Sequence, residues 1–233
     1  AGVADLGDGR SMTVVTHAGD GSLRRWAVDD SGVWSPSILA TMPLGQVPAH
    51  LEIADVTGTG RQDVLVSSSH GVAVVHLDTG ETITTIEDVD LTDGRWTLLL
   101  EDPARGPSLV LAGESAVLIW PPGPGRFPFA AIDVSGRRDP GHSLRSNASG
   151  LGTQLAARVE DRWTVRTTHR SGSGPGQSLQ PVWFGLGGAP AIDFVAVTWS
   201  DGVFQTELNL QEGQVHEIVE TQRQLSSCPV LFA

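Results

Sequence analysis

Apolar and polar residues alternate along much of this chain, and glycine-rich turns interrupt the alternation at short intervals. The alternation is clearest between Ser143 and about Glu220, in segments 155–169, 191–199, 203–210 and 214–219. A period of two sends side chains alternately toward a core and toward solvent. The pattern therefore predicts a small antiparallel β domain of about five or more strands, packed as a sandwich.

Arginines recur at every fourth position in this region, at Arg158, Arg162, Arg166 and Arg170. That spacing would also line one face of a helix, so the period alone is ambiguous. The β-branched content and the apolar residues at odd positions favour a hairpin that turns near residues 160–161. We expect the four guanidinium groups to line one exposed strand face. There they would either bind carboxylates or sulfated glycans, or pair with acidic neighbours on a solvated surface.

The first 140 residues repeat one plan three times, with an acidic, glycine-rich turn followed by short apolar strands. Equivalent points at Asp5, Asp55 and Asp102 lie 50 and 47 residues apart. A period of this size with several strands per unit is typical of propeller blades. Propellers close with about 4–8 blades. We therefore expect either that the chain is an excerpt of a longer one or that its open edge packs on something else.

Proline and glycine punctuate residues 121–142, which we interpret as an exposed connector with the domain boundary near residue 138. The predicted fold class is all-β, with a partial β-propeller of about three recognisable blades and a small antiparallel β-sandwich-like domain. The predicted divisions are residues 1–138 for the blades, 139–225 for the sandwich, and 226–233 for the start of a C-terminal segment that is apparently cut.

Charge and composition narrow the choice of partner. The net charge is −12, and residues 1–140 carry −10 of it, from 19 acidic residues against 9 arginines. An acidic surface repels phosphate backbones, so nucleic acid is excluded as an expected partner. No apolar run approaches the roughly 20 residues of a membrane span. The single cysteine, Cys228, rules out an internal disulfide and is interpreted as a buried thiol.

Oxygen-bearing side chains alternate in the turn of the second repeat, at Asp55, Thr57, Thr59 and Asp63. Oxygens at alternate positions of a glycine-containing loop are typical of a Ca²⁺ site. Two of the four groups are hydroxyls, so a Ca²⁺ ion would bind weakly. The alternative, which we favour, is a β-turn stabilised by Asp55.

Catalytic chemistry has weak candidates. His142 with Ser143, or His169 with Ser171 or Ser173, would place a base near a nucleophile. Neighbours along a strand point to opposite faces, and no acid is placed to orient either histidine. The chain also lacks the metalloprotease, P-loop and dinucleotide motifs. We therefore expect solvent-facing histidines and no catalytic residue.

Two family resemblances cover most of the chain. The run Asp55–Val64 resembles the FG-GAP/VCBS (integrin α-like) propeller repeat, although that family has acidic or amide residues where Thr57 and Thr59 stand. The later region resembles the ASPIC/UnbV domain, which has Pro where Ser200 stands here. The residues that carry this second match are Asn147, 150–158, 171–174, 177–178, 184–187 and 197–202.

The ASPIC/UnbV domain commonly follows FG-GAP repeats in secreted proteins. The resemblance therefore implies a secreted or periplasmic, non-enzymatic binding or scaffold protein. Its partners would be proteins, within a larger assembly that could be membrane-associated through one of them. The alternatives are a calcium-dependent adhesion module, and an enzyme or accessory factor of a biosynthetic pathway.

Overall fold

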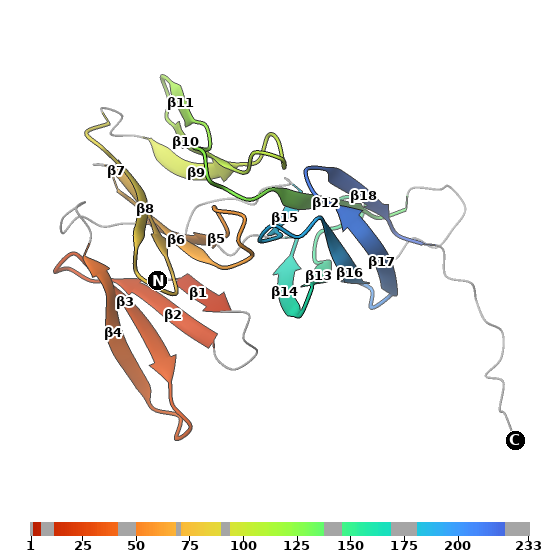
Figure 1. The fold of residues 1–233 in the computed structure, drawn as a ribbon, viewed down its shortest axis with the longest axis horizontal. Coiled ribbons are helices and arrows are strands. Elements are labelled where there is room, and N and C mark those ends of the chain that lie inside the picture. Colours follow the sequence, from red (N-terminus) through yellow and green to blue (C-terminus); the bar gives the residue numbers. More distant parts are fainter. Residues whose placement is uncertain are drawn as a thin grey trace, which may run out of the picture.

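A computed structural model describes residues 2–5, 12–41, 50–68, 71–89, 94–137, 146–168 and 181–221. Within these ranges every regular element is a β-strand (Figure 1), and the strands form five sheets, none of them closed into a barrel. The predicted all-β fold class is confirmed. The described part of the chain accordingly contains no helix that is long and apolar enough to cross a membrane.

Three antiparallel sheets follow one another along the first part of the chain, one for each predicted repeat. In each sheet the strands lie side by side in sequence order, as in a blade. The first sheet contains β1 (Gly2–Asp5), β2 (Met12–His17), β3 (Ser22–Val28) and β4 (Trp34–Thr41). The second contains β5 (His50–Ala54), β6 (Asp63–Ser68), β7 (Gly71–His76) and β8 (Thr82–Glu87). The third contains β9 (Arg95–Leu99), β10 (Ser108–Ala112) and β11 (Val117–Trp120).

The central strands of the second sheet, β6 and β7, are buried on both faces, which explains their unbroken apolar runs. Val64 and Val66 pack toward the first sheet, in a cluster with Val15 and Leu23. Leu65 lies on the opposite face of β6, in a second cluster that includes Leu98 and Leu109 of the third sheet. Strands covered on both faces need apolar residues at every position.

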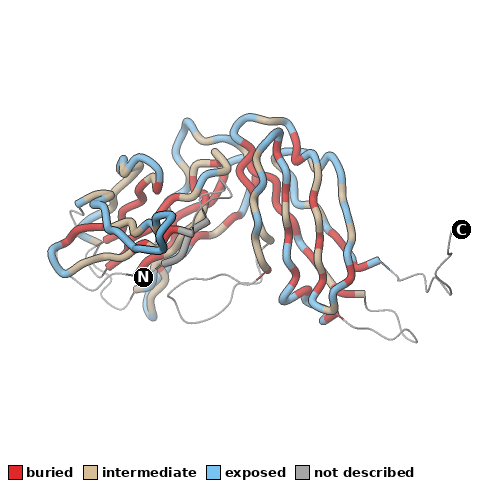
Figure 2. The backbone as a smooth tube through the Cα atoms, turned by 90° about the horizontal axis from the view of Figure 1, so that it is seen from below, coloured by how far each residue is buried: buried red, intermediate tan, exposed pale blue. Residues whose placement is uncertain are grey.

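The C-terminal part contains two further sheets that enclose a core of their own. One sheet has the order β14-β13-β16-β17. Its strands are β13 (Gln154–Val159), β14 (Arg162–Thr167), β16 (Ala191–Thr198) and β17 (Phe204–Gln211). The hairpin predicted for residues 155–169 is confirmed as far as Thr167, with its turn at Glu160 and Asp161. Figure 2 shows buried and more exposed residues alternating along the two central strands of this sheet, β13 and β16.

The remaining sheet, β15-β12-β18, has β12 (Phe129–Ser135) at its centre. This strand pairs antiparallel with β15 (Val182–Gly185) and parallel with β18 (Val215–Val219). Residues 129–135 fall within the connector predicted for 121–142, but their strand pairing places them in the C-terminal unit. The prolines that precede Phe129 suggested that the linker continues beyond this residue, but the linker ends where β12 begins.

Strand β12 contributes to two cores at once. Its even-numbered residues, Ala130, Ile132 and Val134, join the C-terminal core. Its odd-numbered residues Phe129 and Ala131 join the cluster shared with the second and third sheets. The central strand β12 is therefore packed on both faces and joins the blade-like sheets to the C-terminal unit.

Candidate functional site

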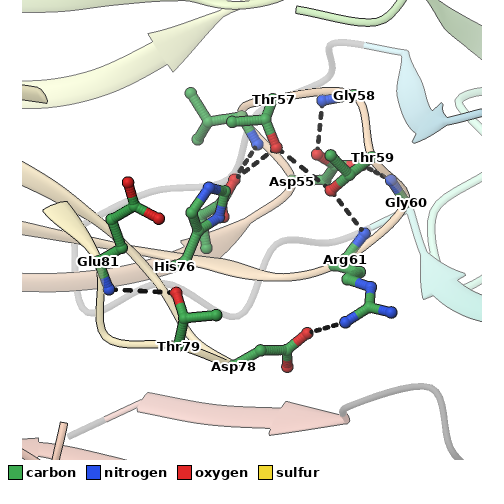
Figure 3. A network of polar contacts seen from close by, with 12 residues as sticks. Asp55, Thr57, Gly58, Thr59, Gly60, Arg61, His76, Asp78, Thr79 and Glu81 are labelled. Carbon is green, nitrogen blue, oxygen red and sulfur yellow. Dashed lines mark hydrogen bonds and ion pairs between the residues drawn. The ribbon is translucent and has the colours of Figure 1, made fainter. Parts of the chain in front are cut away.

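The loop that joins β5 to β6 begins with a buried carboxylate. Asp55 is only 3% exposed, and its two oxygens accept hydrogen bonds from backbone N–H groups of the same loop (Figure 3). Oδ1 accepts from Gly58 at 2.7 Å and Oδ2 accepts from Gly60 at 2.6 Å. Gly58 and Gly60 have φ angles of 77° and 78°, a region that favours glycine. Asp55 thus holds the loop as a tight turn.

A second buried carboxylate, Asp63, closes the other end of the loop. Its Oδ2 accepts from the Val56 N–H at 2.9 Å and from the Thr57 hydroxyl at 3.4 Å. Its Oδ1 lies 2.7 Å from Nδ1 of His76, which is opposite Asp63 in the register of β6 and β7. The loop is therefore fixed at both ends by an aspartate whose oxygens face donors.

Burial sets the acid–base behaviour of this pair. Removal of the Asp55 carboxyl from water, together with the nearby charge of Asp63, raises the pKa of Asp55 to about 7. The Gly60 and Gly58 N–H groups oppose that rise because they stabilise the ionised form. Burial also raises the pKa of Asp63, against the hydrogen bonds from Val56 and His76. The loop therefore contains two carboxyl groups that bind protons more tightly than usual.

The four residues predicted to bind calcium do lie together, but their donors are arranged for a turn. Each carboxylate oxygen of Asp55 and Asp63 faces an N–H or hydroxyl group. The hydroxyls of Thr57 and Thr59 lie 3.2 Å from each other. No group of three or more acidic, histidine or cysteine side chains suited to a metal occurs among the described residues. Because Ca²⁺ requires 6–8 oxygen ligands, this loop fits a calcium ion poorly.

Main-chain and side-chain donors from later parts of the chain bind the carbonyl groups of the same loop. The Gly187 N–H donates to the Gly58 carbonyl at 2.8 Å, and the Phe127 N–H donates to the Thr57 carbonyl at 3.0 Å. The indole Nε1 of Trp183 donates to the Asp55 carbonyl at 3.3 Å. Donors from outside the second sheet thus satisfy the carbonyl groups of the loop, which would otherwise be left without partners.

Arg162 adds a charged side chain to this junction. Its Nη1 donates to the Thr59 carbonyl at 2.9 Å and its Nη2 donates to the Gly185 carbonyl at 3.3 Å. A Cβ atom on Gly60 would overlap the guanidinium group. Arg166, on the same side of β14, faces the side-chain amide of Gln62. With its oxygen oriented toward the guanidinium group, this amide accepts from both Nη atoms of Arg166. These two arginines therefore face the blade-like sheets.

The expectation that all four arginines share one exposed face is wrong. Arg158 is opposite Trp163 in the hairpin, whereas Arg162 is opposite the buried Val159. A two-residue turn pairs residue i with i+3, so even positions before the turn share a face with odd positions after it. Arg158 therefore points away from Arg162 and Arg166. Arg170 lies outside the described residues, and an anion-binding role of these arginines stays a prediction.

Other candidate residues from the sequence also lie outside the described ranges. They are His142, Ser143, His169, Ser171, Ser173 and Cys228. The alternation and turn motifs of the sequence did not predict the role of Gly185. This residue lies in β15, where a Cβ atom would overlap Asp55 and Gly58.

The comparisons with known proteins bear on the C-terminal part of the chain. No curated protein and no solved structure matches this sequence. The family model described as ASPIC and UnbV matches residues 143–225, so this part of the chain contains an ASPIC and UnbV domain.

Proposed function

We propose that this chain is a non-enzymatic binding or scaffold protein, secreted or periplasmic, which contacts other proteins through its blade-like sheets. The proposal agrees with the resemblance of residues 55–64 to FG-GAP repeats and with the ASPIC and UnbV match that follows them, an order expected of secreted proteins similar to cartilage acidic protein 1. It assigns the buried acidic loop a structural role, because the hydrogen bonds of Asp55 and Asp63 all lie within the junction.

Exposed apolar side chains on the first and third sheets carry the proposal. On β4, Trp34 and Ile38 point away from the core, and on β11 Val117 and Ile119 do the same. Ile38 is 70% exposed and Val117 is 59% exposed. Exposed apolar side chains of this kind are typical of protein interfaces, and an arginine lies beside them in each sheet, Arg24 opposite Ile38 and Arg95 in the row of Val117. The two outward faces are therefore suited to a protein partner.

Affinity purification from the source organism tests this function. We expect specific proteins to be recovered with the wild-type chain and lost with the double variant Val117→Asp/Ile119→Asp. The matched control is Val219→Asp, because Val219 is 50% exposed but belongs to β18 in the C-terminal unit. Equal recovery with the double variant, or no enrichment over the tag alone, would contradict the proposal.

A further inference from the structure

The sheet β14-β13-β16-β17 has a face that points away from the C-terminal core, called here the outer face. The strand register arranges its side chains in three rows across the four strands. The first row is Trp163, Arg158, Phe194 and Leu208. The middle row is Val165, Ala156, Ala196 and Thr206. The third row is Thr167, Gln154, Thr198 and Phe204.

The first row is a preformed ridge of three apolar side chains and the guanidinium group of Arg158. The rings of Trp163 and Phe194 meet edge to face, with centroids 5.9 Å apart. The Arg158 guanidinium lies 6.0 Å from the centroid of the Trp163 ring. Trp163 is nevertheless 45% exposed and Leu208 is 67% exposed. Large side chains that hold one another in place lose little freedom when a second surface covers them.

The two end rows complement each other. Arg158, in the first row, only donates hydrogen bonds, and Gln154 occupies the same strand in the third row with an oxygen that accepts them. Leu208 in the first row corresponds to Phe204 in the third, and both are apolar and exposed. Between them, the middle row has the small side chains Ala156 and Ala196 on its inner strands. The outer face is therefore complementary to itself when one copy is reversed along the strand direction.

We infer that the outer face binds a second copy of this chain. The two sheets stack face to face about a two-fold axis that runs between them, along the middle row. Each Arg158 then lies over Gln154 of the other copy, and each Leu208 lies over Phe204 of the other copy. Two-fold pairs of this kind, in which the same patch serves both partners, are the commonest oligomers. Aligned sheets pack in this way at a spacing of about 10 Å.

Charge favours this reversed arrangement over the alternatives. Among the described residues, Arg158 is the one charged side chain in the three rows. If the strands of the two copies ran in the same direction, both Arg158 side chains would lie in the same row, each over Phe194 of the other copy and without an acceptor, and burial of an unpaired charge is costly. Reversal separates the two guanidinium groups and gives each one an acceptor. The inference is independent of the proposed contacts through β4 and β11.

Sedimentation velocity over a wide range of protein concentrations tests the pairing. We expect the wild-type chain to reach the mass of two chains, and Leu208→Arg to keep the mass of one. The matched control is Ile38→Arg, which introduces the same charge at a similarly exposed position of the first sheet and should leave the dimer intact. A wild-type chain that stays monomeric overturns the inference, as does a dimer that survives Leu208→Arg or is lost with Ile38→Arg.

A charge-pair variant tests the orientation. Leu208→Arg and Phe204→Glu should each abolish the dimer, because each one places an unpaired charge in the interface. The double variant should restore it, since the introduced arginine of each copy then meets the introduced glutamate of the other. Circular dichroism confirms that each variant is folded. A folded double variant that stays monomeric overturns the reversed arrangement.

Discussion

The carboxylate of Asp55 lies so close to the backbone of Gly185 that residue 185 has no room for a side chain. A Cβ atom there would overlap Asp55 Oδ2 and the backbone of Gly58. Because these neighbours are a buried carboxylate and a main chain, they cannot move aside easily. We predict that Gly185→Ala lowers the free energy of unfolding by about 1–3 kcal/mol, as overpacking does elsewhere. Urea denaturation measures the change.

Gly123→Ala is the control for this prediction. A Cβ atom at position 123 meets nothing within 4 Å, and the residue does not have a positive φ angle. Its substitution should change the stability by no more than about 0.5 kcal/mol. If both variants unfolded at the same urea concentration as the wild-type chain, the close contact between Gly185 and Asp55 would be contradicted.

Arg162 should contribute more to stability than an exposed arginine does. Its two hydrogen bonds join β14 to the Asp55 loop and to β15, and bonds from a charged donor are stronger than neutral ones. We predict that Arg162→Ala lowers the free energy of unfolding by about 1.5–3 kcal/mol. Arg61→Ala is the comparison, because Arg61 forms an exposed ion pair with Asp78 that is worth about 1 kcal/mol or less. Equal losses in the two variants would refute a junction role for Arg162.

Stability should fall as the pH rises toward neutrality. The pKa of Asp55 is raised from 3.8 to about 7 in the folded protein. Between these values the folded protein retains a proton that the unfolded chain has released, so the free energy of unfolding decreases with increasing pH. Asp63, with its raised pKa, acts in the same direction, and the charge of Arg166 opposes the effect at Asp55. Urea titrations at several pH values between about 4 and 7 measure the slope.

The variant Asp55→Asn isolates the share of Asp55 in that slope. The amide does not titrate, so the pH dependence should become flatter. Its NH₂ group would face one of the two loop N–H donors, so the variant should also be less stable by about 1–3 kcal/mol. An unchanged slope would show that other groups cause the pH dependence.

Calcium binding remains the alternative that the acidic loop suggested. The oxygens of Asp55 and Asp63 face N–H and hydroxyl donors, so we predict no heat when the protein is titrated calorimetrically with CaCl₂. MgCl₂ serves as the control for nonspecific effects on an acidic protein. Saturable heat with CaCl₂ that disappears in Asp55→Asn would support a calcium-dependent adhesion module instead.

The alternation of apolar and polar residues and the turn residues predicted the local structure of this chain. They did not predict contacts between residues that are far apart in the sequence. The hairpin around Glu160 and the blade-like repeats follow from alternation and from turn residues, which act over a few positions. The roles of Gly185 and Arg162 depend on a loop that lies more than a hundred residues earlier. The sequence does contain a signal for each residue. Gly185 interrupts an apolar segment, and Arg162 is paired with the core residue Val159 across the hairpin. Neither signal identifies its partner without the fold.

The position of β12 limits how this protein can be divided for expression. The ASPIC and UnbV match begins at residue 143, whereas the strand between β15 and β18 ends at Ser135. A fragment cut at the family boundary would leave β15 and β18 with unpaired edges, which invite association with other chains. A fragment that begins before Phe129 would keep the sheet but expose Phe129 and Ala131, which the blade-like sheets normally cover. Neither cut releases an intact domain, because the region that matches the family model is shorter than the packed unit that contains β12.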